Sequence, residues 1–182
     1  MPSHGDFSHQ GTALYTPAQR QRRDESVWTV VQGVLAPAQF LVFLISLGLV
    51  LRFLATGEGA QAAHLSIVVK TFFLYAIMVT GAIWEKVVFG QYLLAPAFFW
   101  EDVVSFAVIA LHTVYLVAYA TGWLGETALM MVALAAYAIY VINAAQFLLK
   151  LRAARLQGHQ GQQSVPASGH PNGTAITRAE AV

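Results

Sequence analysis

The chain has 182 residues, of which 57% are hydrophobic and only 10% are charged. Soluble domains carry about 25% charged residues, so this composition is that of a membrane protein and excludes a water-exposed globular domain. The net charge of +1 leaves no basic surface for nucleic acid, and the absence of cysteine excludes disulfides, thiolate catalysis and cysteine-ligated metal sites.

The N-terminal segment 1–15 is polar and lacks an apolar run, so we expect it to be a disordered tail. Thr16 then begins a capping-box pattern, with a proline in the first turn and an amide at Gln19, which predicts the start of a helix. This helix is expected to carry a basic cluster toward the membrane and to continue into the first span without a break. The cluster consists of Arg20, Arg22 and Arg23.

Four apolar stretches follow, each with at least the roughly 20 residues needed to cross a bilayer. They cover residues 27–54, 65–89, 97–121 and 127–149. The segment 157–182 is rich in Gln and Gly and is expected to be a second disordered tail. The sequence therefore predicts an all-α integral membrane protein, a four-transmembrane-helix bundle formed by residues 16–156.

Basic residues mark the same side of the membrane at both ends of the bundle. The arginine cluster precedes the first span, and Lys150, Arg152 and Arg155 follow the last. The positive-inside rule therefore predicts that both termini are cytoplasmic. The connection between the second and third spans then also faces the cytoplasm, and four charged residues border it: Glu85, Lys86, Glu101 and Asp102.

Polar residues form a stripe along the predicted helices. In the third span the stripe stays within about 40° of one line at 100° per residue, whereas Asp102 points about 100° away from it. The simplest packing turns the stripes inward, where amides either bridge helices or line a site. The stripes contain Glu101, Ser105, His112, Tyr115 and Tyr119 in the third span, Tyr140, Asn143, Gln146 and Lys150 in the fourth, and Gln32, Gln39 and Ser46 in the first.

The carboxylates and one histidine are the strongest candidates for chemistry. Glu85, Glu101 and Asp102 are not needed for topology, and two carboxylates directly follow a tryptophan. His112 lies well inside a span, as either a hydrogen-bonded helix contact or an axial ligand to the metal of a macrocycle. The lysines of the spans can either snorkel or take part in a site, and they are Lys70, Lys86 and Lys150.

Several segments are more specific than apolar composition alone would produce. They include Ala-Pro-Ala-Phe-Phe-Trp-Glu-Asp-Val-Val-Ser at 95–105, Thr-Gly-Ala-Ile-Trp-Glu-Lys at 80–86 and Tyr-Val-Ile-Asn-Ala-Ala-Gln-Phe at 140–147. On these segments, and over nearly the whole chain apart from the tails, the sequence resembles the 3-vinyl bacteriochlorophyllide hydratase family.

The resemblance implies a multi-pass enzyme of bacteriochlorophyll synthesis in the bacterial inner or intracytoplasmic membrane. It would add water to the 3-vinyl group of a chlorophyllide or bacteriochlorophyllide and give the 3-(1-hydroxyethyl) product. The expected partners are that substrate, water and the lipid membrane, with no nucleic acid, and the enzyme could contact other pigment-synthesis enzymes. No cofactor is expected beyond the magnesium that the substrate carries.

Hydration of a vinyl group requires an acid that protonates the terminal carbon and a base that orients water. We expect Glu101 to be the acid and Glu85 or Asp102 to be the base. Lys86 is a candidate for binding the substrate propionate and His112 for ligating the substrate magnesium, so that the protein alone holds no metal. The other candidates for the substrate site are Tyr115, Tyr119, Tyr140, Asn143 and Gln39.

Two other classes of function fit the same residues. A non-catalytic pigment- or quinone-binding membrane subunit would also have polar stripes and many aromatic side chains. A small cation or proton transporter could use Glu85, Lys70 and Glu101, but transporters usually show repeated halves, which this sequence lacks.

Overall fold

The computed structural model describes residues 14–163, with side chains up to Ala154. All regular structure in this part is helical, in the order α1 (Pro17–Glu25), α2 (Val27–Thr56), α3 (Ala60–Phe89), α4 (Phe99–Thr121) and α5 (Glu126–Gln163). The four helices after α1 are long and apolar enough to cross a membrane, which confirms the predicted architecture. The tail predictions for residues 1–13 and 164–182 lie outside the described residues.

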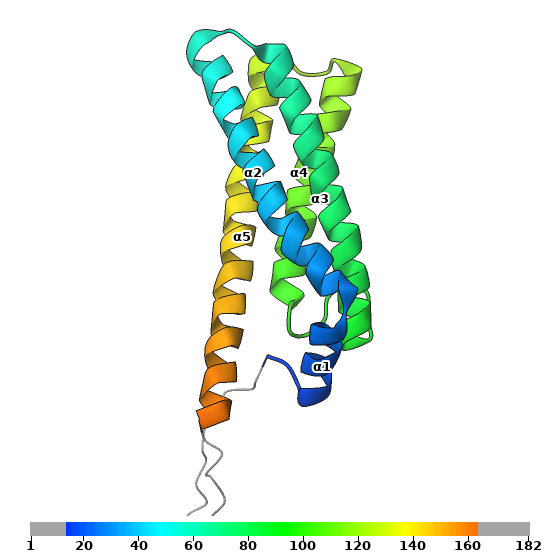
Figure 1. Ribbon diagram of the computed structural model, residues 1–182. Helices are drawn as coiled ribbons and strands as arrows, with labels where there is room; N and C mark the ends of the chain where they lie inside the picture. Colours follow the sequence, from blue (N-terminus) through cyan, green and yellow to red (C-terminus); the bar gives the residue numbers. More distant parts are fainter. Residues whose placement is uncertain (1–13, 164–182) are drawn as a thin grey trace, which may run out of the picture.

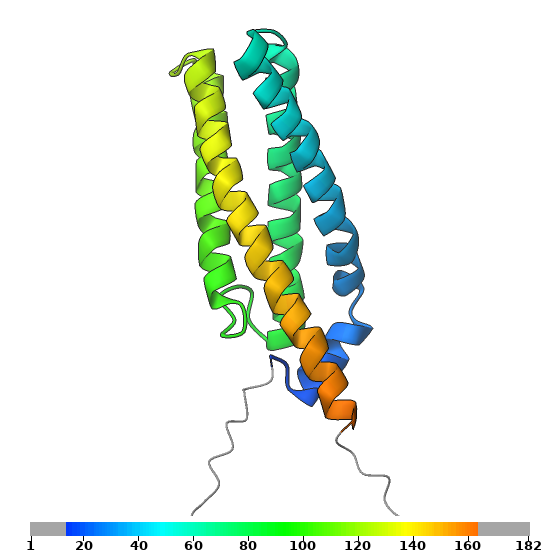
Figure 2. The ribbon, with the colours of Figure 1, turned by 90° about the vertical axis from the view of Figure 1, so that its left-hand side faces the viewer.

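The four long helices form two antiparallel hairpins, α2–α3 and α4–α5 (Figure 1). Figure 2 shows the hairpins side by side, with their tight connections at the top and with α1 and the end of α5 at the bottom. We call this lower end the α1 end; the loop 90–98 between α3 and α4 also lies there. That the α1 end faces the cytoplasm stays a prediction.

The first helix begins as predicted but does not continue into the membrane. Thr16 Oγ1 accepts the N–H of Gln19, and the Thr16 N–H donates to the Gln19 side chain, which completes the capping box of α1. At Ser26 the backbone becomes extended, and the Ser26 hydroxyl accepts the N–H of Trp28. The expectation of one continuous helix was therefore wrong, because this serine caps a second helix.

The described boundaries also differ from the expected tails. Tyr15, which we assigned to the N-terminal tail, is only 4% exposed, because it packs on Phe98 with ring centroids 6.4 Å apart. Helix α5 continues to Gln163, past residue 149, where we ended the span, and residue 157, where we began the tail. Lys, Arg, Leu and Ala follow the span, and these are strong helix formers.

Buried side chains form two clusters. The larger one fills the bundle between the hairpins and includes Phe43, Ile67, Tyr115, Met130 and Tyr137. The smaller one, at the α1 end, is centred on Phe98, which is 2% exposed and stacks on Phe147 at 5.9 Å. This aromatic cluster joins α3, the loop 90–98 and α5.

We expect Phe98→Ala to destabilise the α1 end, because truncating a buried Phe leaves a cavity that costs about 3–5 kcal/mol. Thermal unfolding in detergent should begin at a clearly lower temperature than in the wild type. Trp100→Ala is the control, since Trp100 is aromatic but 68% exposed. Equal losses from the two substitutions would contradict a structural role specific to Phe98.

Candidate active site

Two buried carboxyl groups meet at the α1 end of the bundle. Glu85, near the end of α3, is 5% exposed, and Asp102, in the first turn of α4, is 3% exposed. The two carboxyl groups lie close enough to interact directly. Two ionised carboxylates repel each other, so burial side by side favours a proton on one of them. The pair therefore presents an acid and a base at one place.

The loop 90–98 is fastened to both carboxyl groups. The Leu94 N–H donates to Asp102 Oδ2 at 2.7 Å, and the Ala95 N–H donates to Glu85 Oε2 at 3.2 Å. Leu94 has a φ of 59°, in the left-handed region that costs a residue other than glycine about 1–2 kcal/mol. The two hydrogen bonds hold the loop in this strained conformation and also orient the carboxyl groups.

Glu101, which we predicted to be the acid, faces a different helix. Its Oε2 accepts from Lys150 Nζ of α5 at 2.6 Å, and 9% of its side chain is exposed. Consecutive residues of a helix point about 100° apart, which explains why Glu101 faces α5 while Asp102 faces Glu85 on α3. Because Lys150 holds Glu101 in an ion pair, the geometry favours Glu85 and Asp102 for proton transfer.

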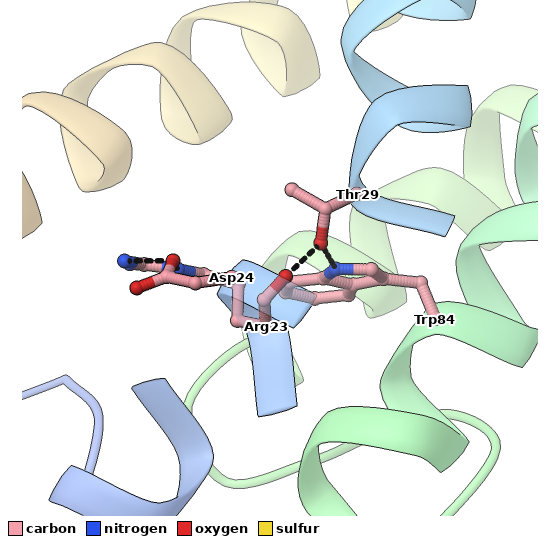
Figure 3. A network of polar contacts seen from close by, with 4 residues as sticks. All are labelled: Arg23, Asp24, Thr29 and Trp84. Atoms are coloured by element: carbon pink, nitrogen blue, oxygen red, sulfur yellow. Dashed lines mark hydrogen bonds and ion pairs between the residues drawn. The ribbon is translucent and has the colours of Figure 1, made fainter. Parts of the chain in front are cut away.

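The aromatic cluster next to the carboxyl groups also anchors α1. Trp84 packs on Phe98 with ring centroids 5.6 Å apart, and its indole N–H donates to Thr29 Oγ1 at 2.9 Å. The Thr29 hydroxyl in turn donates to the carbonyl oxygen of Arg23 at 2.6 Å (Figure 3). The Arg23 guanidinium lies over the ring of Tyr15, and burial raises the pKa of the Tyr15 phenol. These contacts join α1, α2 and α3 around the turn that carries Glu85.

Lys70 is the residue whose environment we misjudged. It is 0% exposed, so it does not snorkel; its Nζ lies 2.8 Å from His112 Nε2 and 4.2 Å from the ring centroid of Tyr140. His112 Nδ1 lies 2.8 Å from the carbonyl oxygen of Val108, so Nδ1–H donates there and Nε2 accepts from Lys70. Both nitrogens of His112 are occupied, and magnesium could bind only if Lys70 left. The position of Lys70 in the middle of a span was the signal for burial.

The tyrosines of the α4 stripe lie far from the carboxyl pair. Tyr115 is 0% exposed, and its hydroxyl is 2.6 Å from His64 Nδ1. Tyr119 is 44% exposed and stacks on His64 with centroids 4.6 Å apart. At 1.5 Å per residue, Tyr115 is about 20 Å along α4 from Asp102. The structure does not bring these two tyrosines together with the carboxyl groups.

The remaining predicted residues lie on the surface or between the hairpins. Lys86 is exposed, and its Nζ donates to the carbonyl oxygen of Gly90 at 2.8 Å, which caps the end of α3. Gln39 and Asn143 are 3% and 8% exposed, as expected for inward-facing positions. Asn143 Nδ2 donates to Ser105 Oγ at 2.8 Å, which joins α5 to α4.

Hollows on the surface of the described residues lie away from the carboxyl pair. One of about 440 Å³ lies against Tyr15 and α1, and one of about 330 Å³ lies in an apolar groove between α2 and α3. Neither is lined by Glu85 or Asp102. Among the side chains described, up to Ala154, no three His, Asp or Glu residues lie close enough together to hold a metal ion.

The chain is similar to proteins of one family. The family described as 2-vinyl bacteriochlorophyllide hydratase matches residues 15–153. The 2-vinyl bacteriochlorophyllide hydratase of Cereibacter sphaeroides is 70% identical over 149 residues, which cover 82% of this chain and 92% of that protein. The protein of the same name from Rhodobacter capsulatus is 68% identical over 145 residues, 80% of this chain and 84% of its own. No solved structure matches.

The ion pair of Glu101 and Lys150 should be coupled in stability. In a double-mutant cycle of Glu101→Gln and Lys150→Met, we expect a coupling free energy of about 1–3 kcal/mol, measured from unfolding in SDS, because the two groups are in direct contact. The control is the exposed pair Arg52 and Glu58, with 3.9 Å between charged atoms, which should give roughly 0–0.5 kcal/mol. Equal coupling in both cycles would contradict a structural role for the buried pair.

Proposed function

Because the chain belongs to the 2-vinyl bacteriochlorophyllide hydratase family, we propose that its buried Glu85–Asp102 pair carries the proton transfers of vinyl hydration. The chain is an enzyme of bacteriochlorophyll synthesis that adds water to the vinyl group of a bacteriochlorophyllide. The 2-vinyl of the family description and the 3-vinyl of our prediction differ in wording only. The hydratase names of both relatives favour this activity over a pigment carrier or a transporter.

The chemistry of the reaction defines what the protein must supply. A proton adds to the terminal carbon of the vinyl group, and a cation forms at the carbon next to the ring, where the macrocycle delocalises it. Water adds to that carbon and gives up a proton, which leaves a 1-hydroxyethyl group. One proton is consumed and one is returned, with no net oxidation or reduction. We therefore propose that an acid and a base suffice, with no cofactor beyond the magnesium of the substrate.

The carboxyl pair can supply both functions with its one shared proton. The protonated member gives the proton to the terminal carbon, which leaves two carboxylates in contact, an arrangement that their mutual repulsion disfavours. Taking a proton from the attacking water restores the original pair. The repulsion therefore makes the pair a strong base when the water attacks, in the manner of other paired carboxylates.

The loop 90–98 is the part that has to move for the vinyl group to reach the pair. Its outer face is apolar: Tyr92 is 60% exposed and Leu94 is 38% exposed, beside Trp100 at 68%. A flat pigment could approach this face from the bilayer. Lys86 Nζ lies on the same face, 5.2 Å from the ring centroid of Tyr92, and stays our candidate for binding the propionate.

The helices and the substrate together also indicate where the enzyme is located. Four helices suited to crossing a bilayer and a pigment substrate fit an enzyme of the bacterial inner or intracytoplasmic membrane. His112 lies about 15 Å along α4 from Asp102, so we no longer favour it as the ligand of the substrate magnesium when the vinyl group is at the pair.

We expect Glu85→Gln and Asp102→Asn each to lower the rate of hydration by about 10²–10⁴-fold, the usual contribution of a positioned proton donor. Each amide keeps an oxygen for the loop N–H, so pigment binding should be retained. Hydration is measured by the blue shift of the absorption maximum that accompanies loss of the vinyl group from conjugation.

Two further variants decide which carboxyl group acts. Glu58→Gln, at an exposed site near the opposite end, should hydrate at the wild-type rate. Glu101→Gln should lose much less activity than Glu85→Gln, because Glu101 forms an ion pair with Lys150. A larger loss from Glu101→Gln than from Glu85→Gln would overturn the assignment in favour of Glu101 as the acid.

A further inference from the structure

Buried amide oxygens between the two hairpins lack hydrogen-bond partners. Gln39 Oε1 on α2, and Asn143 Oδ1 and Gln146 Oε1 on α5, are each buried without one. Leaving a buried acceptor unpaired costs about 1–3 kcal/mol, so such groups are normally met by ordered water or by a ligand. We call Gln39, Ser105, Asn143 and Gln146 the amide layer.

The helix register places Gln39 and Asn143 of this layer at one height in the bundle. Phe43 of α2 and Tyr140 of α5 are in contact, with ring centroids 4.9 Å apart. Gln39 precedes Phe43 by about one turn, and Asn143 follows Tyr140 by about one turn. Because α2 and α5 run in opposite directions, both steps lead toward the α1 end, and Gln146 lies one turn further.

Unused donors lie one turn above the amide layer. Lys70 Nζ lies over the ring of Tyr140, and its hydrogen-bond partner within residues 14–154 is His112. An amine or an ammonium group has more N–H donors than this contact uses. The unused N–H donors of Lys70 therefore lie about one helical turn from the unpaired amide oxygens, and water can form hydrogen bonds with both.

The amide layer adjoins the carboxyl pair through Ser105. Asn143 donates to Ser105 Oγ at 2.8 Å, and Ser105 follows Asp102 by about 4.5 Å along α4. A serine hydroxyl both donates and accepts, so it can hold a water molecule on its other side. The layer thus extends to within about one turn of Asp102, a member of the proposed acid–base pair.

The missing ligand must donate hydrogen bonds, because the unpaired atoms are oxygens. The polar groups at the edge of a bacteriochlorophyllide are carbonyl and carboxylate oxygens, which accept, and the ring face is apolar. Water is the reactant of the hydration that donates. Turning the Asn143 amide over would only exchange which of its two groups lacks a partner, and water would satisfy either.

We propose that the amide layer binds the water that adds to the vinyl group, an inference that rests on the proposed function of Glu85 and Asp102. An amide oxygen of the layer accepts one hydrogen of this water, the other hydrogen faces the carboxylate of the pair, and an oxygen lone pair is left for the cation. When the C–O bond forms, the water proton passes to the carboxylate of the pair. Gln39, Asn143 and Gln146 are positioning residues: they govern capture of the cation and not its formation.

Formation of the cation and its capture by water can be measured separately in D₂O. After deuteron transfer the side chain is a cation with a CH₂D terminus, which either captures D₂O or loses H⁺ or D⁺ to the pair. Loss of H⁺ gives back a vinyl group with deuterium on its terminal carbon. Slower capture should therefore raise the deuterium content of the recovered substrate, whereas slower protonation should lower it.

The experiment compares variants in D₂O and measures product and recovered substrate by mass spectrometry. In Gln39→Met/Asn143→Leu, similar in size but without amides, we expect hydration to fall about 10–100-fold, as for misplaced reactants, while terminal-vinyl deuterium rises above the wild-type level. Gln32→Met is the control on the same helix, because the Gln32 amide already donates to Thr80 Oγ1 at 2.7 Å. It should match the wild type in both measurements.

Glu85→Gln separates this inference from the proposed function. It should lose hydration and deuterium exchange together, and exchange that persists in Glu85→Gln would overturn the proposed role of the pair while leaving the amide layer in place. The inference about the layer is overturned if the double variant hydrates within twofold of the wild type, or if it loses hydration without a rise in deuterium. Pigment binding by absorption identifies a variant that fails to fold, and the single variants Gln39→Met and Asn143→Leu then decide by the same two readouts.

Discussion

Two buried carboxyl groups that lie side by side repel each other when both are ionised, and the α1 end of this bundle is arranged around that constraint. Glu85 comes from one hairpin and Asp102 from the other. Each uses one oxygen to hold a backbone N–H of the loop 90–98. The aromatic cluster around Phe98 lies at the same end of the bundle.

The polar residues of the bundle lie in successive groups along its axis, and each group has a different set of contacts. The carboxyl pair and the ion pair of Glu101 lie at the α1 end, the amide layer follows, and Lys70 with His112 lies above it. Bilayer interiors require every polar group to find its partners within the protein. Among the described side chains, three of the four buried polar atoms without a partner lie in the amide layer, and the fourth is the Tyr15 hydroxyl at the α1 end.

The helices could be predicted from the sequence because bilayer thickness and helical rise constrain them directly. The inward positions of Glu101, Ser105 and His112 also follow from periodicity alone, and so does the angle between Glu101 and Asp102. Which side chain each one meets could not be predicted, since rotation of α4 relative to α3 and α5 decides between Glu85 and Lys150. The helix break at Ser26 was not predicted, because the apolar run that defines the span begins after Ser26 and does not show that this serine caps a new helix.

Leu94 has an unfavourable left-handed backbone conformation, and hydrogen bonds to the two carboxyl groups hold the loop 90–98 in it. Detaching the loop relieves a strained backbone, so opening costs less than the two hydrogen bonds alone would suggest. The residues proposed to transfer the proton are therefore the same residues that hold the loop 90–98. In the proposed mechanism, loss of either carboxyl group would therefore remove a proton-transfer group and also one of the two hydrogen bonds that hold the loop.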